Sequence, residues 1–237
     1  MILQVIYMEK IQLSKRLKAA AKYVKPNLPI ADIGSDHAYL PIYLVQNHII
    51  SSAIAGEVVK GPFDNATNKV LSVGLEKKIS VRLGSGLEVL TPEDNIGTIT
   101  ICGMGGILMA DILKEGLNKS KIPLNARLVL QPNNAEDILR DFLRKNHFKI
   151  ISETIIEENN KLYEIIVAEH HLEYFDYSET ELTFGPLLVE EKSPLFMKKW
   201  QKELALQETI LEKLKNSNDL KKIKQIKEKI CHIKEVL

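Results

Sequence analysis

A glycine turn with an acid on each side is the segment best suited to chemistry. Residues 30–33 form a short apolar run, Gly34 follows it, and Asp32 and Asp36 flank the glycine. A dinucleotide-binding fingerprint that starts at Gly34 would need glycines at Asp36 and Tyr39, because the backbone must approach a diphosphate there. A carboxylate repels phosphates but tolerates a cofactor with an ammonium, a sulfonium and a ribose. These residue types favour S-adenosylmethionine over a nicotinamide dinucleotide.

A further acid, Glu57, follows the glycine turn at the spacing expected of a ribose-binding residue. Glu57 ends the apolar run 52–57 and lies 23 residues after Gly34. An acid about 20 residues after the glycine turn can accept hydrogen bonds from both ribose hydroxyls. We therefore predict that Glu57 binds a ribose, against the alternative that it ends a strand in solvent.

Apolar runs and turns alternate along the first two thirds of the chain. Runs 79–83 and 98–102 end in Gly84-Ser85-Gly86 and Gly103-Met104-Gly105-Gly106, and helix-length segments separate them. This alternation is typical of a doubly wound α/β fold with a parallel sheet, whose ligand crevice lies at the carboxyl ends of the strands.

The later runs extend this sheet. A fifth strand over 128–130 ends in Gln131-Pro132-Asn133, and Asn133 or Asn134 could cap the next helix, through Leu143. Runs 149–156 and 162–168 flank the polar turn 157–160, which predicts an antiparallel hairpin that closes the sheet.

Both ends of the chain carry helical periodicity. Apolar positions within residues 9–24 predict an amphipathic helix that stops before Pro26. After Pro186, two apolar stripes of near-heptad period flank the polar turn 216–219. They predict an antiparallel helical hairpin.

Charge is balanced overall but unevenly placed. The 237 residues carry a net charge of +1, yet residues 153–191 hold eleven acids against Lys161 alone, and residues 198–237 hold eleven lysines against six acids. This layout suggests polarity of binding. Two cysteines, no signal peptide and no apolar run of about 18 residues indicate a cytoplasmic protein without a disulfide framework or membrane span.

Together these motifs resemble one family, the bacterial tRNA N1-adenine methyltransferases that act at position 22 of tRNA. The resemblance covers nearly the whole chain, and its specific part is the long motif over residues 31–41. Shorter matches are residues 13–17, 61–63, 103–106 and 131–133 and the terminal helix pair.

The resemblance implies a Rossmann-like class I methyltransferase fold with a seven-stranded, mostly parallel sheet. It places a methyltransferase domain in residues 1–170 and a linker with a coiled-coil hairpin in residues 171–237. It also implies S-adenosylmethionine as cofactor, tRNA as partner, no metal and no membrane contact, and a monomer. We predict Asp36 as the catalytic residue, because a carboxylate can stabilise the positive charge on the methylated ring. The predicted cofactor-binding residues are Asp32, Gly34, Ser35, His37, Glu57, Ser85, Gly86, Gly103, Met104 and Gly105. The predicted substrate-binding residues are Arg16, Tyr39, Asn133, Lys221, Lys222 and Lys224.

Ser85 departs from the family pattern, which usually has Gly-Asp-Gly after the third strand. A hydroxyl accepts a weaker hydrogen bond from the adenine amino group than a carboxylate does. Three classes of function therefore stay open: the tRNA methyltransferase, a methyltransferase for another RNA or a small molecule, and a tRNA-binding protein whose activity has decayed.

Simpler structural alternatives stand beside several residues. Asp32 and Asp36 could cap a helix, and His37 could orient Asp36, since this transfer needs no general base. Arg16, with Lys15, could belong to a solvated helix face. Cys102 is expected to be a small core residue, and the tail lysines could solvate the hairpin or grip phosphates.

Overall fold

The computed structural model describes residues 10–214 and 219–237. The strands are β1 (Ile30–Ile33), β2 (Ala53–Glu57), β3 (Ile79–Leu83), β4 (Thr98–Met104), β5 (Arg127–Pro132), β6 (Phe148–Glu158) and β7 (Lys161–His170). The α-helices are α1 (Lys15–Ala21), α2 (Tyr39–Gln46), α3 (Lys60–Ser72), α4 (Gly106–Asn118), α5 (Glu136–Lys145), α6 (Glu179–Phe184), α7 (Pro186–Glu191), α8 (Pro194–Lys213) and α9 (Leu220–Val236). Two short 3-10 helices, η1 (Gly86–Val89) and η2 (Pro92–Asp94), follow β3.

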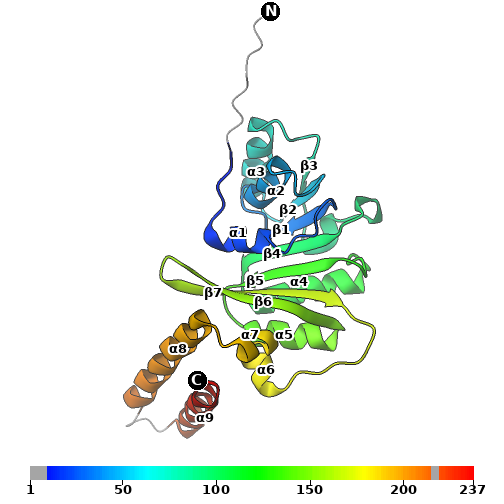
Figure 1. The fold of residues 1–237 in the computed structure, drawn as a ribbon. Coiled ribbons are helices and arrows are strands. Elements are labelled where there is room, and N and C mark those ends of the chain that lie inside the picture. Colours follow the sequence, from blue (N-terminus) through cyan, green and yellow to red (C-terminus); the bar gives the residue numbers. More distant parts are fainter. Residues whose placement is uncertain (1–9, 215–218) are drawn as a thin grey trace, which may run out of the picture.

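All seven strands form one sheet in the order β3-β2-β1-β4-β5-β7-β6 (Figure 1). Strands β1 to β5 are parallel, and β7 pairs antiparallel with both β5 and β6. The predicted seven-stranded, mostly parallel sheet is confirmed. Every residue of β1 and β2 is buried, as expected for parallel strands covered on both faces.

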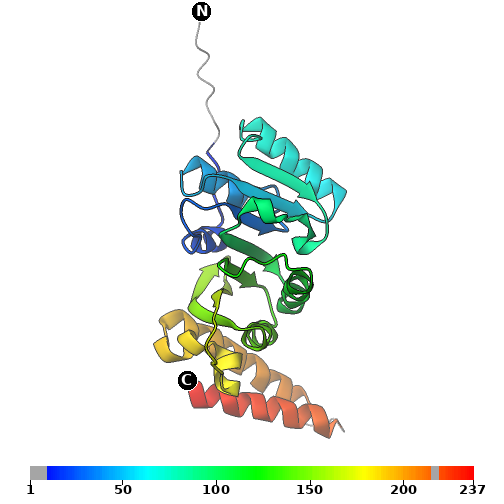
Figure 2. The same ribbon diagram turned by 90° about the vertical axis from the view of Figure 1, so that its right-hand side faces the viewer.

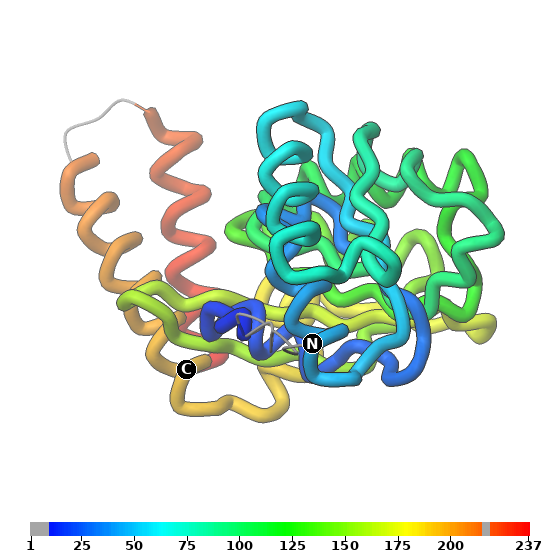
Figure 3. Tube along the Cα trace, turned by 90° about the horizontal axis from the view of Figure 1, so that it is seen from above, coloured from blue at the N-terminus to red at the C-terminus, as the bar shows by residue number. Residues whose placement is uncertain are grey.

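Helices cover the two faces of the sheet with separate apolar cores. One core joins β1 and β2 to α2 and α3, and the other joins β1, β4 and β5 to α4 and α5. Helix α1 packs Ala20 against β5 and β7, beside the long β6–β7 ribbon (Figure 3). The strand order reverses between β1 and β4, so a crevice is expected at their carboxyl ends.

Helix α1 is shorter than the periodicity predicts. It begins only at Lys15, because the Ser14 side chain accepts a hydrogen bond from the Leu17 amide at 3.3 Å and so caps the helix. Ile11 packs into the core from an extended segment before it. Residue 9, where the prediction began, lies outside the described part of the chain.

Two other local predictions are wrong. Neither Asn133 nor Asn134 caps α5, because the N-cap residue is Ala135, in a left-handed conformation at φ 53° and without a side-chain cap. The polar turn after β6 is also shorter, since β6 continues through Glu158 and leaves only residues 159–160 to reverse the chain.

The C-terminal helices α8 and α9 run antiparallel (Figure 2). Residues 216–218 of the predicted turn lie outside the described residues, while the Asp219 side chain caps α9 by accepting from the Lys222 amide at 3.0 Å. Phe196 and Trp200 of α8 pack against Ile233 of α9 and Ile155 of β6. The base of the helix pair therefore shares a core with the edge of the sheet.

A buried cluster of charges lies close to this junction. The Arg140 guanidinium of α5 pairs with Glu153 of β6 at 2.8 Å and with Glu164 of β7, and all three side chains are fully buried. Lys199 of α8 pairs with Glu164 at 2.6 Å and with Glu136 at 2.9 Å. The cluster thus ties α5, both long strands and α8 together.

The pKa shifts of the two buried glutamates follow from how many cations each contacts. Burial raises the pKa of Glu164, but Arg140 and Lys199 outweigh it and hold that pKa below its ordinary value. Burial raises the pKa of Glu153, and Arg140 alone does not reverse the shift. The eleven acids of residues 153–191 therefore do not form one acidic face. Glu157 likewise pairs with Lys198 of α8, at 2.7 Å.

We predict that Arg140→Met lowers the free energy of unfolding by about 3 to 5 kcal/mol, because it leaves buried carboxylates without their shared cation. Urea denaturation measures this loss. The control is Arg144→Met on the same helix, whose ion pairs to Asp141 and Asp176 are partly exposed; it should cost less than about 1 kcal/mol. Equal losses in the two variants would contradict a structural role for the buried cluster.

Candidate active site

A cavity of about 220 Å³ opens where β1 and β4 end, at the reversal of strand order. Seven of the predicted site residues line it, together with Leu17 and Cys102: Arg16, Asp32, Gly34, Ser35, Asp36, Gly103 and Met104. Gly34 has φ +69°, and a Cβ atom there would lie 2.1 Å from the Met104 methyl group. The positive φ favours glycine at this turn, and a larger residue would also displace the flexible Met104 side chain.

Asp32 places a buried carboxylate in this cavity. Its two oxygens accept hydrogen bonds from Ser35 Oγ and Thr100 Oγ1, each at 2.6 Å. Burial raises the pKa of Asp32 to about 6, against the opposing effect of the two hydrogen bonds. Neither partner is a cation, so the site holds a carboxylate that a positively charged ligand group could stabilise.

Three consecutive residues, beginning two positions after Gly34, adopt the left-handed backbone conformation. Asp36, His37 and Ala38 have φ values of 41°, 64° and 56°, which disfavours L-residues by about 1 to 2 kcal/mol each. Glu57 stabilises this turn, because its Oε1 accepts a hydrogen bond from the Asp36 amide at 2.7 Å. Burial raises the pKa of Glu57. Glu57 does not simply end a strand in solvent, since its side chain is buried and holds the turn.

Asp36 is free of a capping role. The N-cap residue of α2 is Ala38, without a side-chain cap, and the Asp36 side chain is 88% exposed at the mouth of the cavity. The helix-cap alternative is therefore wrong for Asp36, and also for Asp32, whose partners are Ser35 and Thr100.

His37 and Tyr39 form a stacked pair. Their ring centroids lie 5.3 Å apart with 24° between the planes, and His37 Nε2 lies 3.6 Å from Asp36 Oδ1. His37 thus contacts both the predicted catalytic carboxylate, Asp36, and Tyr39, a predicted substrate-binding residue. Its place fits an orienting role.

Arg16 points into the protein and not along a solvated helix face. Its guanidinium donates to Gln131 Oε1 at 3.3 Å, lies 3.5 Å from Glu158, and stacks over the Tyr163 ring at 5.4 Å. These contacts keep a cation at the cavity wall. Lys15 reaches the same Glu158 through its backbone amide, at 2.5 Å.

The turn after β5 forms another wall of the site. Asn133 donates from its side-chain Nδ2 to the Gly103 carbonyl at 2.7 Å and from its backbone amide to the Met104 carbonyl at 2.7 Å. A register shift between Cys102 and Met104 bulges β4 toward this turn. We call residues 133–135 the acceptor turn.

Other predicted residues do not line the cavity. His37, Glu57 and Gly105 lie beside it, while Ser85 and Gly86 lie at the end of β3, next to the end of β2, where Gly84 donates to the Glu57 carbonyl at 2.8 Å. The three tail lysines are far removed, because α9 begins at the end of the hairpin remote from the sheet (Figure 2). The structure does not bring Lys221, Lys222 or Lys224 to the site.

Sequence reasoning missed two polar residues of the site and interpreted a third correctly. Thr100 lies opposite Asp32 in the β1–β4 register, and its signal was a hydroxyl within an apolar strand. Gln131 holds Arg16. Burial raises the pKa of the Cys102 thiol, which favours the protonated form and so a packing role.

Within residues 10–214 and 219–237, no group of three or more His, Cys, Asp or Glu side chains is placed to hold a metal ion. No helix in these two ranges is both long and apolar enough to cross a membrane.

We predict that Asp32→Asn stabilises the free protein at pH 7.5 by up to about 3 kcal/mol. The folded chain binds a proton at Asp32 up to about pH 6, whereas an unfolded aspartate loses it near its ordinary pKa of 3.8. Stability from this group is therefore lost as the pH rises from about 4 to about 6, and asparagine avoids the loss. Thermal unfolding from pH 4.5 to 7.5 measures the difference between variant and parent, which should grow with pH; a constant difference would count against this account of Asp32.

Comparison with known proteins places this chain in one family. The family model described as "TrmK: tRNA (adenine(22)-N(1))-methyltransferase" matches residues 30–235. The tRNA (adenine(22)-N(1))-methyltransferase of Bacillus subtilis (strain 168) is 42% identical over 238 residues, covering 97% of this chain and 99% of the relative.

Two solved structures agree with this assignment. A Streptococcus pneumoniae protein in complex with S-adenosyl-L-methionine is 46% identical, with a TM-score of 0.86 over 95% of this chain and 100% of that chain. M. capricolum TrmK in complex with S-adenosyl-homocysteine is 32% identical, with a TM-score of 0.84 over 94% of this chain and 96% of that chain. The chain therefore belongs to the TrmK family of tRNA (adenine(22)-N(1))-methyltransferases.

Proposed function

We propose that this chain transfers a methyl group from S-adenosylmethionine to N1 of adenine 22 in tRNA. The observation that carries the proposal is the pair of acids around Gly34, which line a cavity at the reversal of strand order in a chain of this family. The names of the relatives and their complexes with S-adenosyl-L-methionine and S-adenosyl-homocysteine support it.

The residues present fit this cofactor. Asp32 offers a buried carboxylate with no cationic partner to an ammonium group, and Glu57 offers a second acid to a ribose. Ser35, His37, Ser85, Gly86, Gly103, Met104 and Gly105 complete the proposed cofactor site. Two acids at the cavity would repel a diphosphate. The cofactor supplies an electrophilic methyl group on a sulfonium.

Arg16 is assigned to the cofactor's carboxylate and not to an RNA phosphate. Its guanidinium lines the same cavity as Asp32, and the pair offers opposite charges to the two charged ends of an amino acid. Gln131, Glu158 and Tyr163 hold the guanidinium in place.

Methylation at N1 does not require general acid–base catalysis by the protein. Adenine N1 carries a free lone pair at neutral pH, so no residue must remove a proton before the transfer. Positioning and electrostatic stabilisation therefore dominate. Asp36 faces the cavity with an exposed carboxylate that can stabilise the positive charge on the methylated ring.

Access to N1 requires the adenine to leave its stack, because N1 lies on the Watson–Crick edge. The His37–Tyr39 pair offers an aromatic surface beside Asp36, and Asn133 lies next to the cavity, hydrogen-bonded to Gly103 of its lining. Both are proposed contacts of the extruded base.

The division of labour along the chain is also a proposal. Residues 1–170 carry the cofactor site, and residues 171–237 carry a helical module that holds tRNA. The part of the apolar stripes nearest the sheet, with Phe196, Trp200 and Ile233, is buried against β6 and α7, which supports a monomer. Sequence composition supports a cytoplasmic location.

The methyltransferase assignment predicts that an unmodified tRNA transcript with adenine at position 22 gains one methyl group at N1. Nucleoside mass spectrometry after incubation with enzyme and S-adenosylmethionine detects the product. A transcript with guanine at position 22 is the control and should gain none. Methylation of the control at another adenine would contradict the proposed position, and cofactor binding without methylation of either RNA would favour a decayed tRNA-binding protein.

The catalytic assignment predicts that Asp36→Ala slows the single-turnover methylation rate by on the order of 100-fold, because a preorganised charge is lost. Cofactor affinity by calorimetry should change little. Asp36→Asn keeps the side chain's size and tolerates the left-handed backbone, so it should be similarly slow if charge is the cause. A rate for Asp36→Asn within a few-fold of the parent would rule out the electrostatic role.

A further inference from the structure

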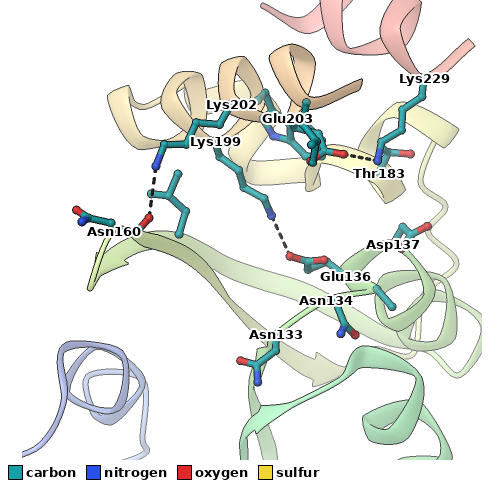
Figure 4. A pocket seen from close by; sticks show the side chains of 14 residues that line it. Asn133, Asn134, Glu136, Asp137, Asn160, Thr183, Lys199, Lys202, Glu203 and Lys229 are labelled. Carbon is teal, nitrogen blue, oxygen red and sulfur yellow. Dashed lines mark hydrogen bonds and ion pairs between the residues drawn. The ribbon is translucent and has the colours of Figure 1, made fainter. Parts of the chain in front are cut away.

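A second and larger hollow lies next to the cavity, between the acceptor turn and the helical hairpin. It is a groove of about 500 Å³ between the start of α5, the β6–β7 turn, α8 and α9 (Figure 4). Asn133 and Asn134 lie on one side of it, and Lys199 and Lys202 reach toward it from α8. We call it the hairpin groove.

The hairpin groove shares a wall with the active-site cavity. Asn133 lines the groove, and its side chain donates to the Gly103 carbonyl, whose residue lines the cavity. An RNA strand whose target base enters at this wall can continue along the groove.

Several charges in the groove are already paired. Lys199 contacts Glu136 at 2.9 Å and Glu164 at 2.6 Å, and Lys229 contacts Glu203. The Lys199 contacts join α8 to the sheet and to α5, the Lys229 contact joins α9 to α8, and neither ammonium is left unpaired for a ligand.

Other polar side chains in the groove are free to form hydrogen bonds with a ligand. Within the described part of the chain, the side chains of Asn134, Asn160 and Asp137 have no hydrogen bond, and all three residues are exposed. The Lys202 ammonium donates only to the Asn160 carbonyl, at 3.4 Å. Carboxamides both donate to and accept from a base edge or a ribose, and an ammonium binds phosphate.

We propose that the hairpin groove binds the nucleotide that adjoins the target adenosine in the RNA strand, with Asn134 and Asn160 contacting its base or ribose and Lys202 its phosphate. The Asp137 carboxylate repels phosphate, so the phosphate lies at the Lys202 side. The inference rests on the proposed function and adds a specific substrate contact to it.

The first test uses the full-length Asn134→Ala/Lys202→Gln double variant with a tRNA transcript. The KM for tRNA should rise about 10-fold while the Kd for S-adenosylmethionine stays unchanged, because the lost contacts lie outside the cofactor site. Lys198→Gln is the matched control: it removes the same charge from α8, but Lys198 lies outside the groove and pairs with Glu157. Its KM should stay within about twofold of the parent. Equal rises in the control and the double variant would overturn the inference, since general charge would then explain both.

The second test locates the nucleotide directly. A transcript with photoreactive 4-thiouridine on either side of adenine 22 is crosslinked to the parent enzyme, and the crosslinked peptides are sequenced. Crosslinks within residues 133–137, 160–162 or 199–206 support the groove. Crosslinks confined to α1, or to residues of α9 other than Lys229, which lines the groove, overturn it, while methylation of adenine 22 by the same enzyme preparation would leave the proposed function standing. If the enzyme binds the transcript but methylates another adenosine, the proposed function is wrong. The crosslinking is then repeated with 4-thiouridine beside that adenosine, and the crosslinked peptides show whether the groove binds its neighbour.

Discussion

Burial of the Asp32 carboxylate at the end of β1 is the constraint on which the site depends. The strand order reverses beside it, so the helices that follow β1 and β4, α2 and α4, pack in separate cores, and a cavity opens where the two paired strands end. Ser35 and Thr100 hydrogen-bond the carboxylate, but hydroxyls supply no compensating charge. The free protein therefore holds a carboxylate with a raised pKa, and a cationic cofactor group would stabilise its ionised form. Destabilisation of the free site and recognition of the cofactor have the same physical origin.

The buried carboxylates between α5, β6, β7 and α8 differ from Asp32, because cations pair with them. Arg140 and Lys199 give Glu164 two cations, and the guanidinium of Arg140 also serves Glu153. Because α5 begins right after the acceptor turn and also supplies Arg140, the cluster that fixes α8 also fixes the place of that turn relative to the hairpin. The positions of the hairpin and of the acceptor turn are thereby coupled through paired charges, not through the apolar core alone.

Much of the fold was predictable because parallel strands, buried on both faces, read as continuous apolar runs ended by turns. The Gly34 turn, Glu57 and the helical hairpin followed from spacing. Local side-chain chemistry was harder to predict. Ser14 shortened α1, and Ala135 adopted a left-handed N-cap where asparagines were expected. The tail lysines were predicted to bind the substrate from the basic charge of the tail; the structure places them at the start of α9, away from the cavity, and their contact with tRNA stays a prediction.

The strained turn after Gly34 explains why the site residues that matter are contiguous. Three left-handed residues in a row would relax in a free peptide, so other groups must hold them. Glu57, on the neighbouring strand, accepts a hydrogen bond from the Asp36 amide. Ser35, within the turn itself, donates a hydrogen bond to the Asp32 carboxylate. The acid proposed for the ribose thus also sets the direction of the acid proposed for catalysis. A cofactor ribose that hydrogen-bonds to Glu57 would share this carboxylate with the Asp36 amide. Cofactor binding and the position of Asp36 are therefore linked through one side chain.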